Sequence, residues 1–421
     1  MPVEPPAGCR PRRIWMSNIL VVGGGFAGVW SAAAAVRLRR IAGAGEAECS
    51  VTLVSAGDDL VIRPRLYQAE PERMRVSLDR VLGPVGVDRV AATATGIDTG
   101  RRRVTAVRRD GRSIELSYDR LVLASGSHLV RPDLPGAEHL HDVDTLPAAA
   151  ALDAHLHWLP DLPAGPGRFT AVVVGAGFTG LEIATELVDR LRAVAEPHGA
   201  VGEVRVVLVE RADVVGPDLG PGPRPVVLDA LSALGVQQRL GATIRAVEPD
   251  RVRLSDGSVL DARTVVWTAG VRASPLTADV PAPRDGLGRL AVDPYLRVAG
   301  VPEVYAAGDT AAAQAEDGHQ VMQSCQHAGP LGRFAGHNVA ADLLGLPQEP
   351  FAPDPYVTCL DLGSAGAVFT TGWERAVASA HQAAKQRKRT VNEVWIYPPV
   401  DDAEELLRRA DFRVSTRQPV A

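Results

Sequence analysis

Short apolar runs that lead into glycine turns, and then into alanine- or leucine-rich stretches, recur along this 421-residue chain. Residues 19–23 (ILVVG) have the pattern of a buried strand, and residues 29–42 after the turn are typical of a helix. A second apolar strand is expected at 50–55. Residues 88–126 alternate apolar and polar positions, which predicts a hairpin followed by a strand.

The same order of patterns returns in the second half of the chain. A predicted strand at 171–175 precedes a glycine turn, a helix at 181–194, a strand at 203–210 and a helix near 225–234. Each half then has an Asp-Gly hairpin and closes on a strand that ends in small residues: Asp110-Gly111 and Ser125-Gly126, then Asp256-Gly257 and Ala269-Gly270. We interpret this as an internal duplication of one βαβ-plus-hairpin unit. The expected fold class is α/β, with two Rossmann-like dinucleotide-binding domains.

Both glycine turns have the G-x-G-x-x-G spacing. In such a turn the first glycine permits the tight bend, the second lets a pyrophosphate approach the backbone, and the third lets helix and strand pack closely. The helix that follows presents unpaired N–H groups to the phosphates. The glycines are Gly23, Gly25 and Gly28 in the first copy and Gly175, Gly177 and Gly180 in the second. Two matched turns predict two bound dinucleotides.

The residue that ends the second strand differs between the copies. Glu210 ends "VRVVLVE", where a carboxylate can accept hydrogen bonds from a ribose diol and would repel a 2′-phosphate. This favours NADH over NADPH, although the adjacent Arg211 leaves NADPH open. The matching residue of the first copy is Ser55, with Asp58 and Asp59 close behind as alternative partners for a ribose.

Composition narrows the function classes. A net charge of −5 gives no reason to expect a nucleic-acid partner, and four scattered cysteines exclude a zinc site and a disulfide framework. No apolar stretch is long enough to span a bilayer, and the proline-rich start does not resemble a signal peptide. We therefore expect a cytoplasmic protein. Only two of the 45 basic residues are lysines, which we interpret as coding bias.

The chain resembles the flavoproteins with two dinucleotide-binding domains, and among them is most similar to type II NADH dehydrogenases. The matching stretches are "VVGGGFAG", "IRPRLYQ", "YDRLVLASG", "VVVGAGFTGLEIATEL", "VVWTAGVRASPL" and "VYAAGD", between residues 19 and about 345. The resemblance implies that the first turn binds FAD and the second binds NAD(P)H. The expected domains are a disordered extension (1–15), an FAD-binding domain in two parts (16–150 and 288–345), an NAD(P)H-binding domain (151–287) and a small C-terminal α+β domain (346–421).

The resemblance also implies roles for single residues. Asp309, after Gly308, would hydrogen-bond the ribityl chain of FAD, and Arg63-Pro64 would lie beside the isoalloxazine. A helix starting near Val321 would point its positive end at the flavin. The strand ends Ser125, Gly126, Ala269 and Gly270 are expected to contact the cofactors. Glu182 has two interpretations: a glutamate near the nicotinamide, or an acid that stabilises the dipole of its helix from the first turn.

The expected activity is hydride transfer from NADH to flavin N5, and then electron transfer to a quinone or quinone-like acceptor. The family lines its quinone site with A-Q-x-A-x-Q, whereas this chain has "MQSCQH" at 322–327. Gln323 matches, and His327 replaces the second glutamine. His327 is either a proton donor to the acceptor, with a rate that falls as pH rises through 6.5, or a core histidine. A soluble reductase acting on another small molecule, and an NADH-sensing flavoprotein without turnover, are the alternatives.

Membrane contact and oligomeric state are less well determined. Leu406, Leu407, Ala410 and Phe412 share one face of the helical stretch 401–413, which could contact a membrane peripherally at its cytoplasmic side. The basic run 385–389 (KQRKR) could bind anionic lipid, but we expect a charged surface loop. A homodimer stays open.

Overall fold

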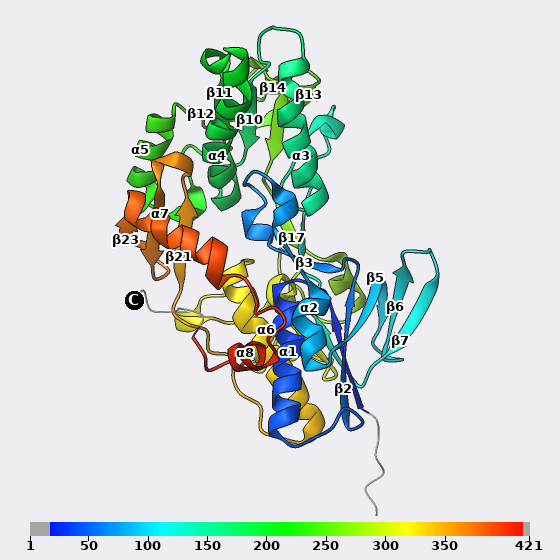
Figure 1. The fold of residues 1–421 in the computed structure, drawn as a ribbon. Coiled ribbons are helices and arrows are strands. Elements are labelled where there is room, and N and C mark those ends of the chain that lie inside the picture. Colours follow the sequence, from blue (N-terminus) through cyan, green and yellow to red (C-terminus); the bar gives the residue numbers. More distant parts are fainter. Residues whose placement is uncertain (1–16, 416–421) are drawn as a thin grey trace, which may run out of the picture.

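The computed structural model describes residues 17–415. The expected extension at 1–15 therefore lies outside the described residues. Figure 1 shows two α/β lobes stacked on each other, with the C-terminal segment (orange to red) along one side of the junction between them. The lower lobe contains both the first part of the chain and a later part, in yellow, whereas the upper, green lobe is formed by the middle of the chain.

The sheet of the lower lobe is parallel through its first five strands and antiparallel in the last two. Its order is β19-β8-β1-β2-β5-β6-β7, with pairs such as Ile19↔Val51 between β1 and β2. The strands are β1 (Ser17–Val22), β2 (Cys49–Ser55), β5 (Asp88–Asp98), β6 (Arg103–Arg108), β7 (Ser113–Ser117), β8 (Arg120–Leu123) and β19 (Val304–Ala306). The parallel strands β1, β2 and β8 contain buried runs of valine, leucine and isoleucine, as expected for strands covered on both sides, whereas β6 and β7 alternate in burial.

The sheet of the upper lobe is entirely parallel, in the order β12-β11-β10-β16. Its strands are β10 (Thr170–Val174), β11 (Arg205–Val209), β12 (Gln237–Arg239) and β16 (Thr264–Trp267). An antiparallel sheet follows, made of β13 (Ile244–Glu248), β14 (Arg251–Leu254) and β15 (Val259–Asp261). The order β8-β1-β2-β5 thus corresponds to β16-β10-β11-β12, so the α/β fold class and its duplication are confirmed.

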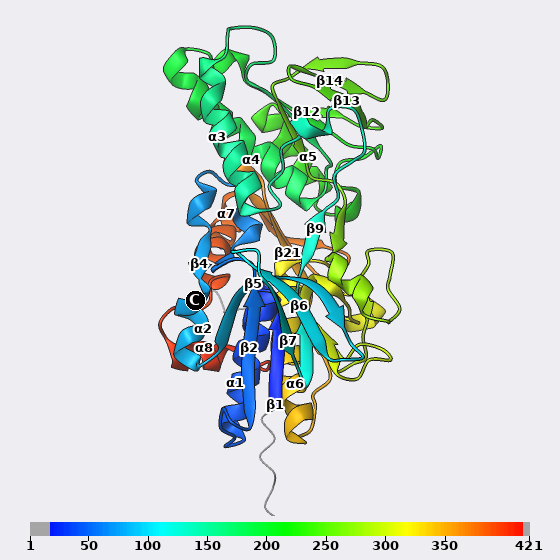
Figure 2. The same cartoon turned by 90° about the vertical axis from the view of Figure 1, so that its right-hand side faces the viewer.

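The two chain crossings between the lobes pair with each other. They are β9 (Ser127–Leu129) and β17 (Val271–Ala273), which directly follow the closing strands of the two copies and form a two-stranded antiparallel ribbon. Figure 2 shows β9 rising from the lower lobe toward the upper one. The small residues at the ends of β8 and β16 therefore lie where the lobes meet.

Helices cover both sheets. They are α1 (Phe26–Ile41), α2 (Leu78–Leu82), α3 (Leu146–Trp158), α4 (Phe178–Ala195), α5 (Arg224–Leu234) and α6 (Cys325–Leu344). The remaining short strands are β3 (Asp59–Val61), β4 (Arg75–Ser77), β18 (Leu290–Ala291) and β20 (Ala311–Ala312). Strands and helices expected from the sequence at 19–55, 171–210 and 225–234 are confirmed with boundary shifts of a few residues. Helix α1 begins three residues earlier than expected, directly after the glycine turn.

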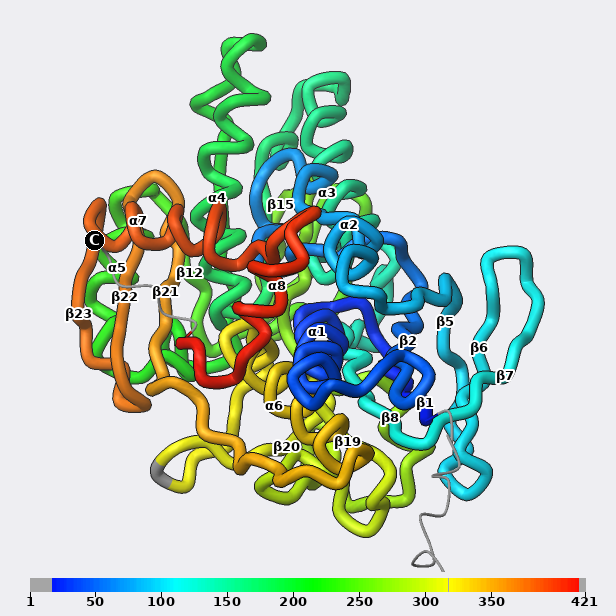
Figure 3. The backbone as a smooth tube through the Cα atoms, turned by 60° about the horizontal axis from the view of Figure 1, so that its bottom comes forward, coloured from blue at the N-terminus to red at the C-terminus, as the bar shows by residue number. Residues whose placement is uncertain are grey.

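Helices α1 and α6 make the most extensive helix–helix contact of the fold. A Cβ on Gly332 would lie 2.4 Å from the Ala27 carbonyl oxygen, and one on Gly336 would lie 2.1 Å from that of Ser31. The two backbones therefore touch, and Figure 3 shows α6 passing directly beside α1. This close approach joins the first and the later part of the lower lobe.

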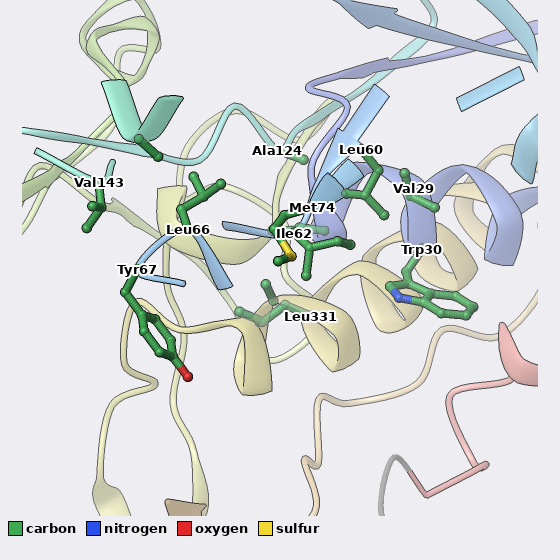
Figure 4. Close-up of a cluster of buried hydrophobic side chains, with 14 of the residues drawn as sticks. Val29, Trp30, Leu60, Ile62, Leu66, Tyr67, Met74, Ala124, Val143 and Leu331 are labelled. Carbon is green, nitrogen blue, oxygen red and sulfur yellow. The ribbon is translucent and has the colours of Figure 1, made fainter. Parts of the chain in front are cut away.

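A large apolar cluster lies between these helices, the first sheet and the loop after β3. Figure 4 shows Leu60, Ile62 and Met74 pointing toward Leu331 of α6, while Tyr67 lies further along the loop with its hydroxyl at the cluster's edge. Each of the three aliphatic side chains is almost completely buried. The loop that carries Arg63 is thus fixed by its own apolar residues.

The C-terminal part is an α+β unit, as expected. It has the antiparallel sheet β21 (Val357–Asp361), β22 (Ala367–Thr371) and β23 (Ala376–Ala380), then α7 (His381–Thr390), a π-helical turn (Val391–Trp395) and α8 (Ala403–Arg409). The expectation of a surface loop at 385–389 is wrong, because these residues belong to α7. No helix in 17–415 is long and apolar enough to cross a membrane.

Candidate dinucleotide and acceptor sites

The two glycine turns have the same geometry. A Cβ on Gly28 would lie 1.8 Å from the Gly23 carbonyl oxygen, and one on Gly180 equally close to that of Gly175. The third glycine of each turn therefore has no space for a side chain. At the second glycines, Gly25 and Gly177, a Cβ would meet nothing within 4 Å.

Each second glycine is also the N-cap of its helix, and neither helix has a side-chain cap. The first-turn N–H groups of α1 and α4 thus stand over open space and are free to bind an anion. This is the arrangement that a dinucleotide pyrophosphate requires.

The ends of the second strands are structurally equivalent. Gly23 N–H donates to the Val54 carbonyl at 2.9 Å, and Gly175 N–H donates to the Val209 carbonyl at 2.8 Å, so Ser55 and Glu210 occupy matching positions. Ser55 lies against Gly24, where a Cβ would be 2.3 Å from its Oγ.

Both carboxylate oxygens of Glu210 accept backbone hydrogen bonds. Oε2 accepts from Ala176 N at 2.7 Å and Oε1 from Ala212 N at 2.8 Å. The carboxylate is therefore held at the glycine turn, where a ribose diol could reach its remaining lone pairs. Arg211 is exposed. The expected alternatives in the first copy are engaged elsewhere: Asp58 pairs with Arg89 and Asp59 with Arg75.

Four polar side chains converge where β8 and β19 end. Asp309 Oδ2 accepts from Ser127 Oγ at 2.6 Å and lies 3.7 Å from Arg63 Nη1, while Arg63 Nη2 pairs with Asp144. Burial raises the pKa of Asp309, although Ser127 and Arg63 oppose the shift. Arg63 is thus a member of this cluster rather than an isolated surface group.

An unpaired polar atom lies beside the first glycine turn. The Ser125 hydroxyl is buried and has no hydrogen-bond partner among residues 17–415, and a Cβ on Gly23 would clash with the Ala124 carbonyl at 2.2 Å. A buried hydroxyl without a partner is costly, so a bound group is expected to satisfy it. The open cradle of α1 and this orphan hydroxyl fit a flavin dinucleotide.

The helix expected near Val321 begins later. Ser324 is the N-cap, its Oγ accepts from His327 N, and α6 begins at Cys325. Residues 321–323 lie outside any helix, and Gln323 Nε2 donates to the Asp309 carbonyl oxygen at 3.1 Å. The structure therefore places Gln323 beside the Asp309 cluster at the start of α6.

His327 lies at one end of a stack of four rings. Its ring is nearly parallel to Tyr356 at 5.7 Å, Tyr356 to Trp373 at 4.2 Å, and Trp373 to His319 at 4.5 Å between centroids. Nδ1 accepts from Met322 N–H. Burial lowers the pKa of His327 to about 4. The expected titration near pH 6.5 is therefore wrong, because the desolvated ring stays neutral there.

Glu182 does not stabilise its helix from the first turn. Since α4 begins at Phe178, Glu182 lies one turn further on, and its Oε1 accepts from Lys388 Nζ of α7 at 2.8 Å. The pair is largely buried. Burial raises the pKa of Glu182. Burial alone would lower the pKa of Lys388, but the attraction of the nearby Glu182 carboxylate is the larger effect, so the pKa of Lys388 is raised.

The chain's other lysine also points inward. Lys385 Nζ pairs with Asp361, whose second oxygen accepts from Tyr67 Oη at 3.0 Å. Asp361 N–H in turn donates to Glu182 Oε1 at 3.1 Å. This network was not predicted from the sequence. The one signal for it was that the two lysines lie three residues apart, which places them on one helix face.

The expected membrane face of 401–413 packs inward. Leu406 and Ala410 are 0% and 1% exposed, and Leu407 and Phe412 pack against the same core. These side chains are unavailable to a membrane.

The described cysteines Cys49, Cys325 and Cys359 are all free, and burial raises the pKa of the Cys49 thiol to about 11.

Comparison with known proteins agrees with this geometry. The model of the family described as pyridine nucleotide-disulphide oxidoreductase matches residues 17–332, most of the chain. The chain belongs to this family. An NADH dehydrogenase-like protein of Mycobacterium tuberculosis is 48% identical over 96% of this chain and its own full length.

A further relative and a solved structure are also similar to this chain. A type II NADH:quinone oxidoreductase of Mycobacterium tuberculosis is 28% identical over 83% of this chain and 78% of its own. The fold matches NDH2 of Plasmodium falciparum in complex with NADH, with a TM-score of 0.74 at 13% identity over 90% of this chain and 94% of that one. The expected resemblance is confirmed. The protein is an NAD(P)H-dependent flavin-type oxidoreductase related to type II NADH dehydrogenases.

Proposed function

We propose that this protein is an FAD-dependent enzyme that oxidises NADH and reduces a quinone or quinone-like aromatic. The observation that carries the proposal is the pair of open glycine cradles, one ending in Ser55 and the other in Glu210. FAD would occupy 16–150 with 288–345, and NADH would occupy 151–287. When bound, FAD accepts hydride from NADH and transfers the electrons to the acceptor.

The chain's residues contribute positioning and electrostatics. The N–H groups of α1 would hold the FAD diphosphate, and Asp309, Ser125 and Arg63 would bind its polar groups. Glu210 would accept hydrogen bonds from the NADH ribose. Gln323 and His327, at the start of α6, are proposed to face the acceptor. Glu182 and Lys388 form an ion pair beside the junction of the lobes.

The proposal is tested on purified protein. We expect a yellow protein with about one FAD per chain, rapid anaerobic bleaching by NADH, and turnover with a soluble quinone. Bleaching without turnover on any quinone would favour an NADH sensor, and turnover confined to non-quinone acceptors would favour a soluble reductase. A folded, colourless protein that takes up no FAD would contradict the proposal.

Coenzyme choice depends on Glu210. Glu210→Gln should weaken NADH binding and relax discrimination against NADPH by about 1–3 kcal/mol, because a charge-assisted acceptor is lost. The measurement is kcat/KM for both coenzymes, with Arg211→Gln as the matched control. A wild-type preference for NADPH, abolished by Arg211→Gln, would show that Arg211 decides instead.

A further inference from the structure

The turn between β22 and β23 reaches the beginning of α4. The Cζ of Arg375, at the end of this turn, lies 5.7 Å from the ring centroid of Phe178, the first residue of α4. It lies 5.6 Å from the ring centroid of Tyr356 in the four-ring stack. Arg375 thus stands where the NADH-side helix and the acceptor-side stack meet.

The hydrogen-bond partners of Arg375 are all uncharged. Nη1 donates to the Asp218 carbonyl oxygen, and Nη2 donates to Tyr356 Oη at 3.4 Å and to Met322 Sδ at 3.6 Å. Its Nε is buried without a partner. Within the described part of the chain, no carboxylate lies within 4.0 Å of this guanidinium. A partly buried cation without an anion is unfavourable, so the position favours an anionic ligand.

The backbone and its neighbours hold this guanidinium in place. The backbone of Arg375 has φ 50°, a left-handed conformation that residues other than glycine rarely adopt. Two residues earlier, Trp373 is stacked between Tyr356 and His319. On the other side, a Cβ on Gly222 would lie 3.0 Å from the Arg375 carbonyl oxygen. The turn is therefore fixed from both lobes, and strain of this kind is typical of functional sites.

The open cradle of α4 begins at the residue that Arg375 contacts. Gly177 caps that helix without a side-chain hydrogen bond, and Phe178, against which Arg375 lies, is the next residue. We propose that Arg375 binds the diphosphate of NADH, so that the C-terminal sheet supplies a residue to the coenzyme site. This inference rests on the proposed function, because it requires a dinucleotide at the second glycine turn.

Two kinds of group would contact the diphosphate, the backbone of α4 and the side chain of Arg375. The first-turn N–H groups of α4 contribute a fixed dipole, whereas Arg375 contributes a full charge beside Phe178, the first residue of the same helix. Removing Arg375 should therefore weaken ligands that carry the diphosphate and leave ligands without phosphate unaffected.

The experiment measures the binding of ADP-ribose and adenosine to the FAD-loaded protein by competition with NADH. Arg375→Gln should weaken ADP-ribose about 10- to 100-fold, the range for a charge-assisted hydrogen-bonded pair. Adenosine should bind unchanged, and Arg375→Lys should recover part of the loss. The matched control is Glu374→Gln in the same exposed turn, which should bind both ligands as the wild type does.

The outcomes are distinguishable. Equal weakening of ADP-ribose and adenosine, or no weakening of ADP-ribose, would overturn the role of Arg375 and leave the proposed function standing. A wild-type protein that binds neither NADH nor ADP-ribose would overturn the proposed function itself. Flavin content and thermal unfolding of each variant show that the fold is intact, and Arg375→Lys gives a second test if the glutamine variant unfolds.

Discussion

At the scale of single residues, the two lysines have a structural role that the composition of the chain did not predict. We interpreted their scarcity as coding bias, yet both amines bind carboxylates in the interior between α4, β21 and α7. The Lys385–Asp361 bond joins α7 to β21 within the C-terminal unit, whereas the Lys388–Glu182 bond joins α7 to α4, 206 residues earlier in the chain. No local pattern could show the second bond, because Glu182 becomes the partner of Lys388 only once the C-terminal unit has packed on α4.

Lys388→Met should therefore destabilise the protein. The substitution leaves the Glu182 carboxylate buried without its cation, which typically costs about 3–5 kcal/mol. We expect this loss in the free energy of unfolding, measured by denaturant titration. The double variant Lys388→Met/Glu182→Gln should recover much of it, and Arg389→Met, which removes an exposed charge from the same helix, should have little effect. Equal losses in the single and double variants would show that the pair is not coupled.

His327 makes stability depend on pH. Its pKa in the folded protein is about 4, below the ordinary 6.5. Between these values the unfolded chain binds a proton that the folded chain does not. The contribution of His327 is therefore complete above pH 6.5 and is lost as pH falls toward 4, by at most about 3 kcal/mol.

The measurement is the free energy of unfolding from pH 7 to 4. His327→Gln should make the curve less steep in this range, leaving the slope due to other histidines, namely His141, His155 and His337, whose pKa values burial also lowers. An unchanged slope would mean that His327 is solvated and titrates normally.

At the scale of elements, most helices and strands that have a periodic pattern of apolar residues were predicted from the sequence. The strands and helices of both copies were placed from apolar runs, glycine turns and Asp-Gly hairpins, since each of these signals is local. Helix α7 was missed because its sequence, HQAAKQRKRT, has no apolar stripe; its buried face contains Ala384 and Lys388. The start of α6 was misplaced because it is set by the cap Ser324, which is itself in an extended conformation and accepts a hydrogen bond from His327 N.

The packing of α1 on α6 depends on two glycines. Gly336→Ala should destabilise the protein by about 1–3 kcal/mol or more, because the new methyl group would overlap the Ser31 carbonyl oxygen and force the helices apart. Both helices begin at the proposed flavin site, so FAD retention should decrease as well. Thermal unfolding and flavin content measure the two effects.

Gly329→Ala in the same helix is the control. A Cβ there would lie 3.8 Å from the Trp30 ring, an ordinary contact. The exchange of glycine for alanine within a helix should then be neutral or stabilising by up to about 1 kcal/mol. If both variants were equally stable, α1 and α6 would be further apart than the structure has them.

At the scale of the whole molecule, the duplicated lobes and the third, C-terminal unit surround one junction. The duplication was predictable from sequence because both copies repeat the same signals in the same order. The junction was only partly predictable: Arg63, Asp309 and Gln323 were expected there, whereas Lys388, Asp361, Tyr356 and Arg375 come from segments without a recognised motif. Peripheral membrane contact and a homodimer stay predictions, and the face proposed for the former is packed inward.

The separation of the proposed sites across this junction leads to a kinetic prediction. Helix α4 would serve NADH, and the first turn of α6 would serve the acceptor. His327→Ala should therefore leave anaerobic reduction by NADH intact and slow reoxidation by a quinone. The loss should be about 10²–10⁴-fold if the imidazole transfers a proton, and much smaller if it only shapes the pocket.

The buried, neutral state of His327 sharpens this prediction. Because its pKa lies near 4, the wild-type reoxidation rate should not decrease through pH 6.5 on account of this residue. Gln323→Leu, which removes the hydrogen bond to the Asp309 carbonyl, should affect the same half-reaction. Rapid mixing measures each half separately. A His327→Ala variant defective in reduction by NADH, or unchanged in both halves, would assign His327 to packing in the ring stack and would place the acceptor elsewhere at the junction.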